Sequence, residues 1–319
     1  MVVPVQNIVE TVDLTPQDAL LPLYECVVNS IISLIQSKER QKEIQIKIKR
    51  GGNPSQLSTS GIRTIHSIII TDNGIGFHDN NFKSFETPFS KVNKEFGCKG
   101  VGRFTMLASF REIYVRSNYA ENGTWMYREF KCDAESEVQP ISLRTSEIEE
   151  NKTSIELLDC FNPIIKDRTA ISIEEISQEL MNHCLIYYLS GQMPKVTIFE
   201  ADSKKGEVLN DLYAKVSKEK ERKFEIANHS FKAYITKVKK ENNRKHHYIY
   251  YCANSRVVGQ GSSVGKINAS FSYPLNEKVC FIFWMSILFL ITSIIKIIRR
   301  EMAFLFHKKR KILFSMTPT

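Results

Sequence analysis

Three short segments of the chain carry residues whose types and spacing suit nucleotide chemistry. Glu25 and Asn29 are four residues apart, so a helix places them on one face. Asp72 follows a β-branched run and opens an Asp-x-Gly-x-Gly sequence, with glycines at 74 and 76. A second glycine-rich segment spans 97–102. A carboxylate at the end of a buried strand, beside loops through which the backbone can approach a ligand closely, is typical of a nucleotide site.

The second glycine-rich segment precedes a helix predicted near 103–110. Unpaired N–H groups and the positive dipole end at a helix N-terminus attract phosphate. An acidic residue beside such a loop would repel phosphate, unless its carboxylate binds the nucleobase or a metal ion instead. The arrangement therefore predicts a nucleotide whose phosphates are bridged by Mg²⁺, with Asn29 as an oxygen ligand.

The elements that position these residues follow from the patterns around them. Apolar residues at helical spacing predict a helix over 16–37, and Thr15, Pro16 and Asp18 mark its start. Alternating or β-branched runs predict strands. The strands expected in the first half are 44–48, 65–71, 111–117, 124–131 and 154–158. In the second half we expect a helix from 173 and strands at 195–200, 224–226, 231–238 and 248–253.

The order of these segments resembles the GHKL superfamily of ATPases over about residues 10–160. Segment 25–29 resembles the N box of that superfamily, 72–77 its Asp-x-Gly-x-Gly box, and 97–102 its glycine-rich lid. Residues 152–155 resemble its late Gly-Thr strand, with Lys152 where the family usually has glycine. The resemblance implies an α+β fold: a Bergerat-type two-layer α/β sandwich of helices over a mixed sheet, then a smaller α/β transducer-like domain.

The resemblance also implies roles for individual residues. Glu25 would be the general base that activates the attacking water, and Asn29 would hold Mg²⁺. Asp72 would accept a hydrogen bond from the adenine amino group, supported by the hydroxyl of Thr153. The glycines that let the strand end pass under the base would be Gly74 and Gly76. The residues expected to close on the phosphates are Lys99, Gly100, Val101 and Gly102.

Three regions are expected along the chain: an ATP-binding domain over 1–165, the transducer-like domain over 170–270, and a tail over 271–319. The ATP domain begins near 15, which leaves no room for the dimerisation helices of a histidine kinase. The layout is therefore closer to the heat-shock chaperones, MutL and gyrase B. Residues 251–258 resemble the Asn-x-Arg strand of their second domain. Segment 261–266 resembles a Walker A loop, but Gln260 and Ile267 occupy two of its required positions, so we reject it.

The expected function is ATP binding with slow Mg²⁺-dependent hydrolysis, in which ATP closes the lid, two copies associate as a homodimer, and hydrolysis resets them. The alternative is a nucleotide-gated binding module with negligible turnover. The presence of Glu25 favours the first. The sequence leaves open whether the partner is a protein client or a nucleic acid.

Bulk composition supports a cytoplasmic protein with a hydrophobic core. Hydrophobic residues make up 42% of the 319, and the net charge is +9. Six of those nine charges lie in 279–319, so the rest of the chain is only mildly basic and gives little support for DNA binding. The seven cysteines form no Cys-x-x-Cys pair, which favours reduced thiols over a zinc site or disulfides.

The tail allows three interpretations. Residues 279–295 carry no charge and are followed by Lys296, Arg299 and Arg300. This pattern fits a membrane anchor over 279–298. It also fits a buried helix, or an aberrant sequence produced by a frameshift, because the composition changes abruptly there.

Overall fold

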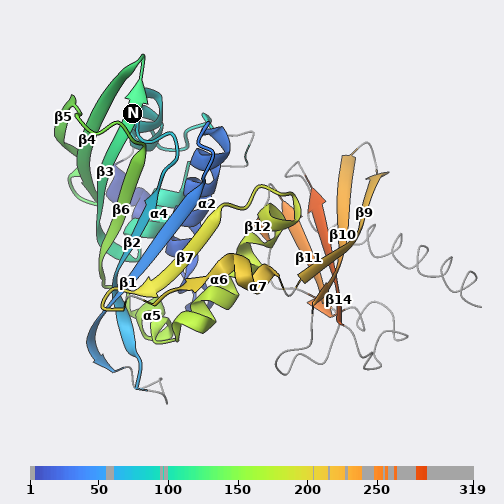
Figure 1. The fold of residues 1–319 in the computed structure, drawn as a ribbon. Coiled ribbons are helices and arrows are strands. Elements are labelled where there is room, and N and C mark those ends of the chain that lie inside the picture. Colours follow the sequence, from blue (N-terminus) through green and yellow to red (C-terminus); the bar gives the residue numbers. More distant parts are fainter. Residues whose placement is uncertain are drawn as a thin grey trace, which may run out of the picture. The chain divides into compact units, whose positions relative to one another are not determined.

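The structure is a computed structural model that describes residues 4–54, 61–93, 96, 100–203, 205–214, 216–226, 229–238, 248–253, 256–257, 262–263 and 278–285. It divides into two compact units, Met1–Tyr213 and Ala214–Thr319. The first unit is an α+β sandwich of helices on a mixed sheet, which confirms the predicted fold class (Figure 1).

The sheet of the first unit has eight strands in the order β5-β4-β3-β6-β2-β1-β7-β8. Neighbouring strands run antiparallel except β1 and β7, which are parallel. The strands are β1 (Glu43–Pro54), β2 (Arg63–Asp72), β3 (Phe110–Glu121), β4 (Thr124–Asp133), β5 (Glu137–Thr145), β6 (Lys152–Cys160), β7 (Lys195–Glu200) and β8 (Glu207–Val208).

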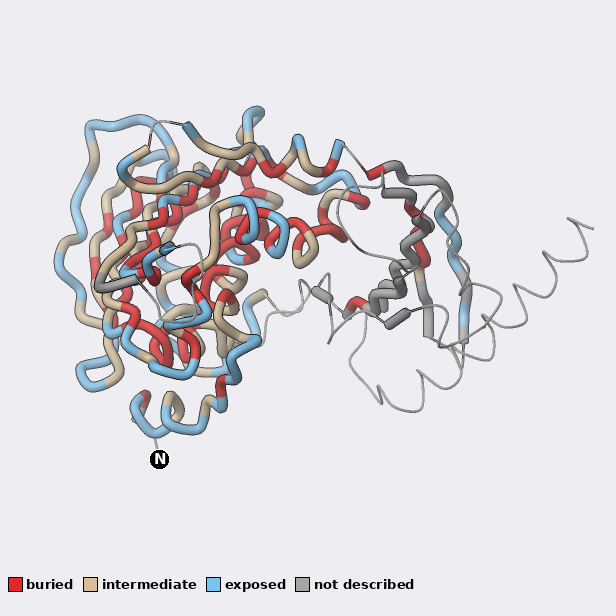
Figure 2. The backbone as a smooth tube through the Cα atoms, turned by 90° about the horizontal axis from the view of Figure 1, so that it is seen from below, coloured by how far each residue is buried: buried red, intermediate tan, exposed pale blue. Residues whose placement is uncertain are grey.

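Helices cover one face of this sheet. Along β1, Ile44, Ile46 and Ile48 are buried while Gln45 and Lys47 are exposed, so the opposite face meets solvent. Figure 2 shows the same alternation of buried and exposed residues along the strands. The helices are α1 (Val5–Glu10), η1 (Pro16–Asp18), α2 (Leu21–Gln36), α3 (Asp79–Glu86), α4 (Gly102–Leu107), α5 (Pro163–Lys166), η3 (Asp167–Thr169), α6 (Ile173–Leu189) and α7 (Leu209–Tyr213).

The helix predicted over 16–37 is two elements. The backbone N–H of Thr15 donates to Asp18 Oδ2 at 2.8 Å, so the predicted start signal caps the 3₁₀ helix η1. The long helix α2 begins only at Leu21. The strands predicted at 111–117 and 124–131 are both longer and form a hairpin, with Asn122 and Gly123 in its turn at φ of 51° and 80°.

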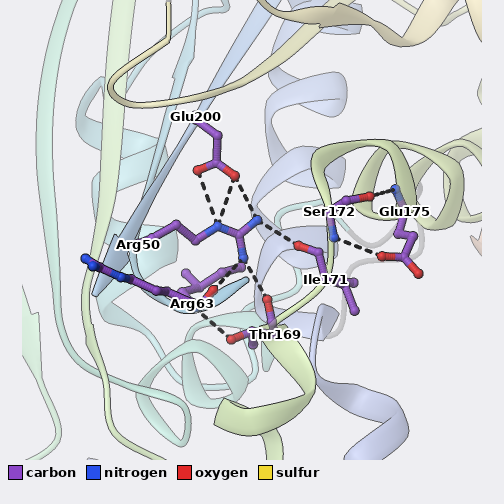
Figure 3. A network of polar contacts seen from close by, with 8 residues as sticks. Arg50, Arg63, Thr169, Ile171, Ser172, Glu175 and Glu200 are labelled. Carbon is purple, nitrogen blue, oxygen red and sulfur yellow. Dashed lines mark hydrogen bonds and ion pairs between the residues drawn. The ribbon is translucent and has the colours of Figure 1, made fainter. Parts of the chain in front are cut away.

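The first unit extends to Tyr213, whereas the sequence placed its boundary between 165 and 170. The reason is that β7 pairs with β1 and so extends the first sheet, with β8 beyond it at the edge. Arg50 on β1 reinforces this pairing: its Nε donates to Glu200 Oε1 at 3.0 Å, and its two terminal nitrogens donate to the carbonyls of Thr169 and Ile171, each at 2.8 Å (Figure 3). The segment that leads into α6 is thereby tied to the sheet.

The described part of the second unit is a separate sheet in the order β12-β11-β14-β10-β9, with β13 paired to β11. Its strands are β9 (Val216–Ile226), β10 (His229–Val238), β11 (Tyr248–Ala253), β12 (Arg256–Val257), β13 (Ser262–Ser263) and β14 (Lys278–Met285). No helix lies among the described residues of this unit. The helix expected from 173 is α6, and both α6 and α7 belong to the first unit.

Strand β14 corrects the interpretation of the tail. Residues 278–285 pair with β10 on one side and β11 on the other, so an anchor or buried helix over 279–298 cannot begin where we expected. The apolar run is rich in aromatic and β-branched residues, which suit a central strand flanked on both sides. Residues 286–298 lie outside the described residues. Among the described helices, only Pro16–Gln36 is long and apolar enough to cross a membrane, and 56% of its apolar window is buried, as in a core helix.

Candidate functional site

A row of buried polar side chains crosses the helix-covered face of the first sheet. Strand register pairs Asp72 with Thr153, Thr153 with Ser117, and Ser117 with Arg128, on four neighbouring strands. Their exposed fractions are 4%, 3%, 0% and 5%, respectively. Burial of polar groups is unfavourable unless they are hydrogen-bonded, so such a row in an apolar core calls for a function.

Asp72 is held in a fixed orientation at the end of β2. Ser30 Oγ on α2 donates to Asp72 Oδ2 at 2.7 Å, and the backbone N–H of Gly74 donates to Oδ1 at 2.9 Å. Burial raises the pKa of Asp72 to about 6, and these two hydrogen bonds limit the rise. The carboxylate is thus a pre-oriented acceptor that is ionised at neutral pH.

The middle of the row is a pair of hydroxyls. Ser117 Oγ and Thr153 Oγ1 are 2.8 Å apart, and the backbone N–H of Phe77 donates to Ser117 Oγ at 2.9 Å. Gly76 precedes this contact with a φ of +70°, and a β-carbon there would lie 2.7 Å from Cβ of Tyr119. Only glycine therefore lets the chain turn under the sheet at this position.

Glu25 lies next to the end of the glycine-rich segment. A β-carbon on Gly102 would come within 2.7 Å of Glu25 Oε2, so a side chain at 102 would push the carboxylate out of its present position. Asn29 follows one turn later on α2 and is exposed. Cys26 follows Glu25 on α2. Burial raises the pKa of the Cys26 thiol, and the nearby carboxylates of Glu25 and Asp72 raise it further. Both carboxylates therefore belong to one neighbourhood of α2.

The glycine-rich segment closes back on the residues that follow α3. The backbone N–H of Phe89 donates to the carbonyl of Gly100 at 3.2 Å, and both residues have positive φ, 57° and 67°. Gly97, Cys98 and Lys99 lie outside the described residues, so the expected contact of Lys99 stays a prediction. Helix α4 has six residues, so the dipole at its N-terminus is weaker than the sequence suggested.

Arg103 links the two ends of this segment. Its guanidinium is buried, and its terminal nitrogens donate to the carbonyls of Phe85 and Glu86, the second at 2.9 Å. It also lies over the rings of Phe85 and Phe104, at 5.6 and 4.9 Å from their centroids. Burial lowers the pKa of Arg103 from its ordinary value. The last turn of α3 is therefore tied to the first turn of α4.

The structure brings predicted site residues together in two groups, one around Asp72 and one around Glu25. Asp72 faces Thr153 across β2 and β6, despite Lys152 in place of the family glycine, and Glu25 contacts Gly102. In the second unit, residues 251–253 and 256–257 of the predicted Asn-x-Arg segment form β11 and β12, while 254, 255 and 258 lie outside the described residues. Of segment 261–266, only Ser262–Ser263 is described, as β13.

Four polar side chains around the candidate site were missed by the sequence analysis: Ser30, Ser33, Arg103 and Ser117. The signal for the serines was available, because each is a polar residue at a position where the helix stripe or the strand alternation requires an apolar one. Ser33 Oγ accepts from the N–H of Ile75 at 3.0 Å, next to the Asp72 turn. No comparable pattern marks Arg103, whose partners come from another element.

No protein-family model matches the chain, and no curated protein matches it either. The structure is similar to a crystal structure of the N-terminal domain of a DNA repair protein, with a TM-score of 0.54 and 12% sequence identity. The match covers 92% of this chain and 94% of that one. At this identity the likeness establishes the fold alone.

Proposed function

We propose that the first unit binds ATP in a pocket of the GHKL type, with Asp72 as the residue that recognises adenine. The proposal rests mainly on the setting of Asp72, which is buried, held by Ser30 and Gly74, and opposite Thr153. The adenine amino group donates hydrogen bonds, and a fixed, ionised carboxylate accepts one. Guanine carries a carbonyl at that position, which cannot donate, so ATP is preferred over GTP.

The proposal includes slow hydrolysis of ATP to ADP and phosphate. Glu25 is the general base that takes a proton from the attacking water. Support comes from the contact between Glu25 and Gly102, because the glycine-rich segment is the backbone expected to hold the phosphates. The nucleotide would extend from Asp72 at one end of α2's buried face toward Glu25 and Asn29.

Asn29 suits the expected role in holding Mg²⁺. This ion keeps several waters and takes one or two protein oxygens together with the substrate phosphates. An exposed carboxamide one turn from Glu25 fits that demand. Among the described residues no cluster of three His, Cys, Asp or Glu side chains could hold a metal, so the phosphates and water would complete the shell. When bound, the ion neutralises charge on the phosphates.

The fold likeness to a DNA repair protein domain is compatible with the MutL branch of the GHKL superfamily. The wider proposal is a conformational cycle: ATP closes the segment that carries Gly100, two copies associate, and hydrolysis releases them.

Calorimetry with ATP and GTP, each with Mg²⁺, tests the adenine site. ATP should bind more tightly than GTP. Asp72→Asn should weaken ATP binding by roughly 5- to 150-fold, because the new amide directs a donor at the adenine amino group. Asp211→Asn, at an exposed position of α7, is the matched control and should bind as the wild type does. Equal binding of ATP and GTP would count against the pocket, whereas ATP binding without phosphate release would favour the nucleotide-gated module.

A further inference from the structure

The paired hydroxyls of Ser117 and Thr153 share one hydrogen bond whose direction matters. Their oxygens are 2.8 Å apart, and either could donate. A third group removes the symmetry: the N–H of Phe77 can only donate, and it donates to Ser117 Oγ at 2.9 Å. One lone pair of Ser117 is therefore already occupied, and its remaining capacity is one lone pair and one hydrogen.

Counting hydrogens leaves two arrangements. If Thr153 donates to Ser117, the hydrogen of Ser117 has no other acceptor among the described contacts, and Ser117 is 0% exposed. If Ser117 donates to Thr153, the free hydrogen is that of Thr153, the residue that stands opposite Asp72. An orphaned buried donor is unfavourable, so a ligand acceptor beside Asp72 selects the second arrangement.

The second arrangement matches the edge of adenine. Asp72 offers an acceptor and Thr153 offers a donor, while adenine presents an amino donor next to the N1 acceptor. Guanine presents the reverse, a carbonyl acceptor next to an N1–H donor. The contact of Thr153 with N1 is either direct or through one bridging water.

We propose that Ser117 is a positioning residue for nucleotide specificity: it directs the Thr153 hydroxyl as a donor toward N1 of adenine. This inference rests on the proposed adenine site. Ser117 acts through Thr153, held in place by the Phe77 backbone and by the strand register that sets β3 beside β6.

The test compares binding of ATP and 1-deaza-ATP, in which carbon replaces N1, by calorimetry with Mg²⁺. The wild type should prefer ATP by roughly tenfold, the value of one hydrogen bond to a fixed donor. Ser117→Ala and Thr153→Val should each reduce that preference to about twofold or less. The double variant should lose no more than either single one. Ser177→Ala, which removes another fully buried hydroxyl with no described partner, should keep the full preference.

The ratio of the affinities for ATP and 1-deaza-ATP distinguishes a loss of specificity from a general loss of structure. A general loosening of the site by Ser117→Ala would weaken both ligands equally, and an unchanged ratio would overturn the inference. If Ser117→Ala does not fold, Ser117→Cys keeps an acceptor for Phe77 but is a weak donor, and its preference should also fall. A wild type that binds ATP and 1-deaza-ATP equally contradicts the role of Ser117, whereas one that binds neither contradicts the proposed function itself.

Discussion

Gly102 lies directly against Glu25, so that a β-carbon on the glycine would come within 2.7 Å of Glu25 Oε2. Real β-carbons do not approach a carboxylate oxygen this closely, so a side chain here has to displace the carboxylate. The contact couples the start of α4 to the proposed general base. The proposed hydrolysis would therefore depend on the absence of a side chain at 102.

We therefore expect Gly102→Ala to lower ATP turnover by about 10²-fold, because a general base out of place by roughly an ångström loses most of its effect. ATP affinity should fall less than turnover, because Asp72 and its partners are untouched and Gly102 is one of several backbone groups expected to hold the phosphates. The control is Gly123→Ala, at a hairpin turn with φ of +80° and open space around it. That variant is strained and should lower stability, yet its turnover should match the wild type. Normal turnover of Gly102→Ala would show that Glu25 does not act from this position.

Glu25→Gln tests the base without changing the volume of the side chain. The amide cannot take a proton from water, so turnover should fall by about 10²–10⁴-fold, the usual contribution of a positioned base. Affinity for ATP should stay within a few fold. Phosphate release and calorimetry on the same preparations give both numbers, with Glu174→Gln on the exposed first turn of α6 as the control. Wild-type turnover in Glu25→Gln would refute the catalytic role.

The buried carboxylate of Asp72 should make stability depend on pH. Its pKa rises from 3.8 unfolded to about 6 folded, so the native state holds the proton more tightly. The stabilising contribution is present in full below about pH 4 and is lost as the pH rises through 6. This difference between the folded and unfolded pKa of Asp72 corresponds to roughly 3 kcal/mol of unfolding free energy. Urea unfolding between pH 4 and 7 should show this fall, and Asp72→Asn should flatten it.

ATP affinity should follow the opposite trend. The adenine amino group needs the ionised carboxylate, so affinity should rise from pH 5 through the pKa of Asp72, about 6, and level off near pH 7. Asp72→Asn should remove this rise. A wild-type affinity that is constant over the same range would mean that Asp72 does not contact the nucleotide.

The pairing of Asp72 with Thr153 could be predicted, because both residues belong to sequence segments with a known order. The burial of Ser117 could be predicted from the strand alternation, but its place beside Thr153 could not, because that depends on which strands become neighbours over long sequence separations. The same reason explains the domain boundary: nothing local in 195–200 shows that this strand pairs with β1. The start of the tail, residues 279–285, was predicted wrongly as helix for another reason. An apolar run has the composition of both a membrane span and a central strand, and only its partners β10 and β11 distinguish them.

Arg103 should be a large contributor to the stability of the first unit. Arg103→Ala leaves the carbonyls of Phe85 and Glu86 without their donors and removes a stacked cation, which together should lower the unfolding free energy by about 2–4 kcal/mol. Arg111→Ala is the control, because Arg111 also lies over a ring, that of Phe161, but its side chain is 67% exposed. Arg111→Ala should lower the unfolding free energy by less than about 1 kcal/mol. Equal losses in the two variants would contradict the role given to Arg103.

Strand β14 makes the second unit sensitive to the position at which the chain is shortened. β14 lies between β10 and β11, so a chain that ends before Lys278 leaves two strands of that sheet without their shared neighbour. Unpaired N–H and C=O groups on such edges promote aggregation.

A chain that ends after Met285 keeps all eight paired residues of β14. We expect the longer chain to resist limited proteolysis within the strands β9, β10 and β11 and the shorter one to be cleaved there. Asp72, Thr153 and Glu25 lie in the first unit, so ATP binding should survive both truncations. Proteolytic resistance of the shorter chain would mean that β14 does not hold the second sheet together.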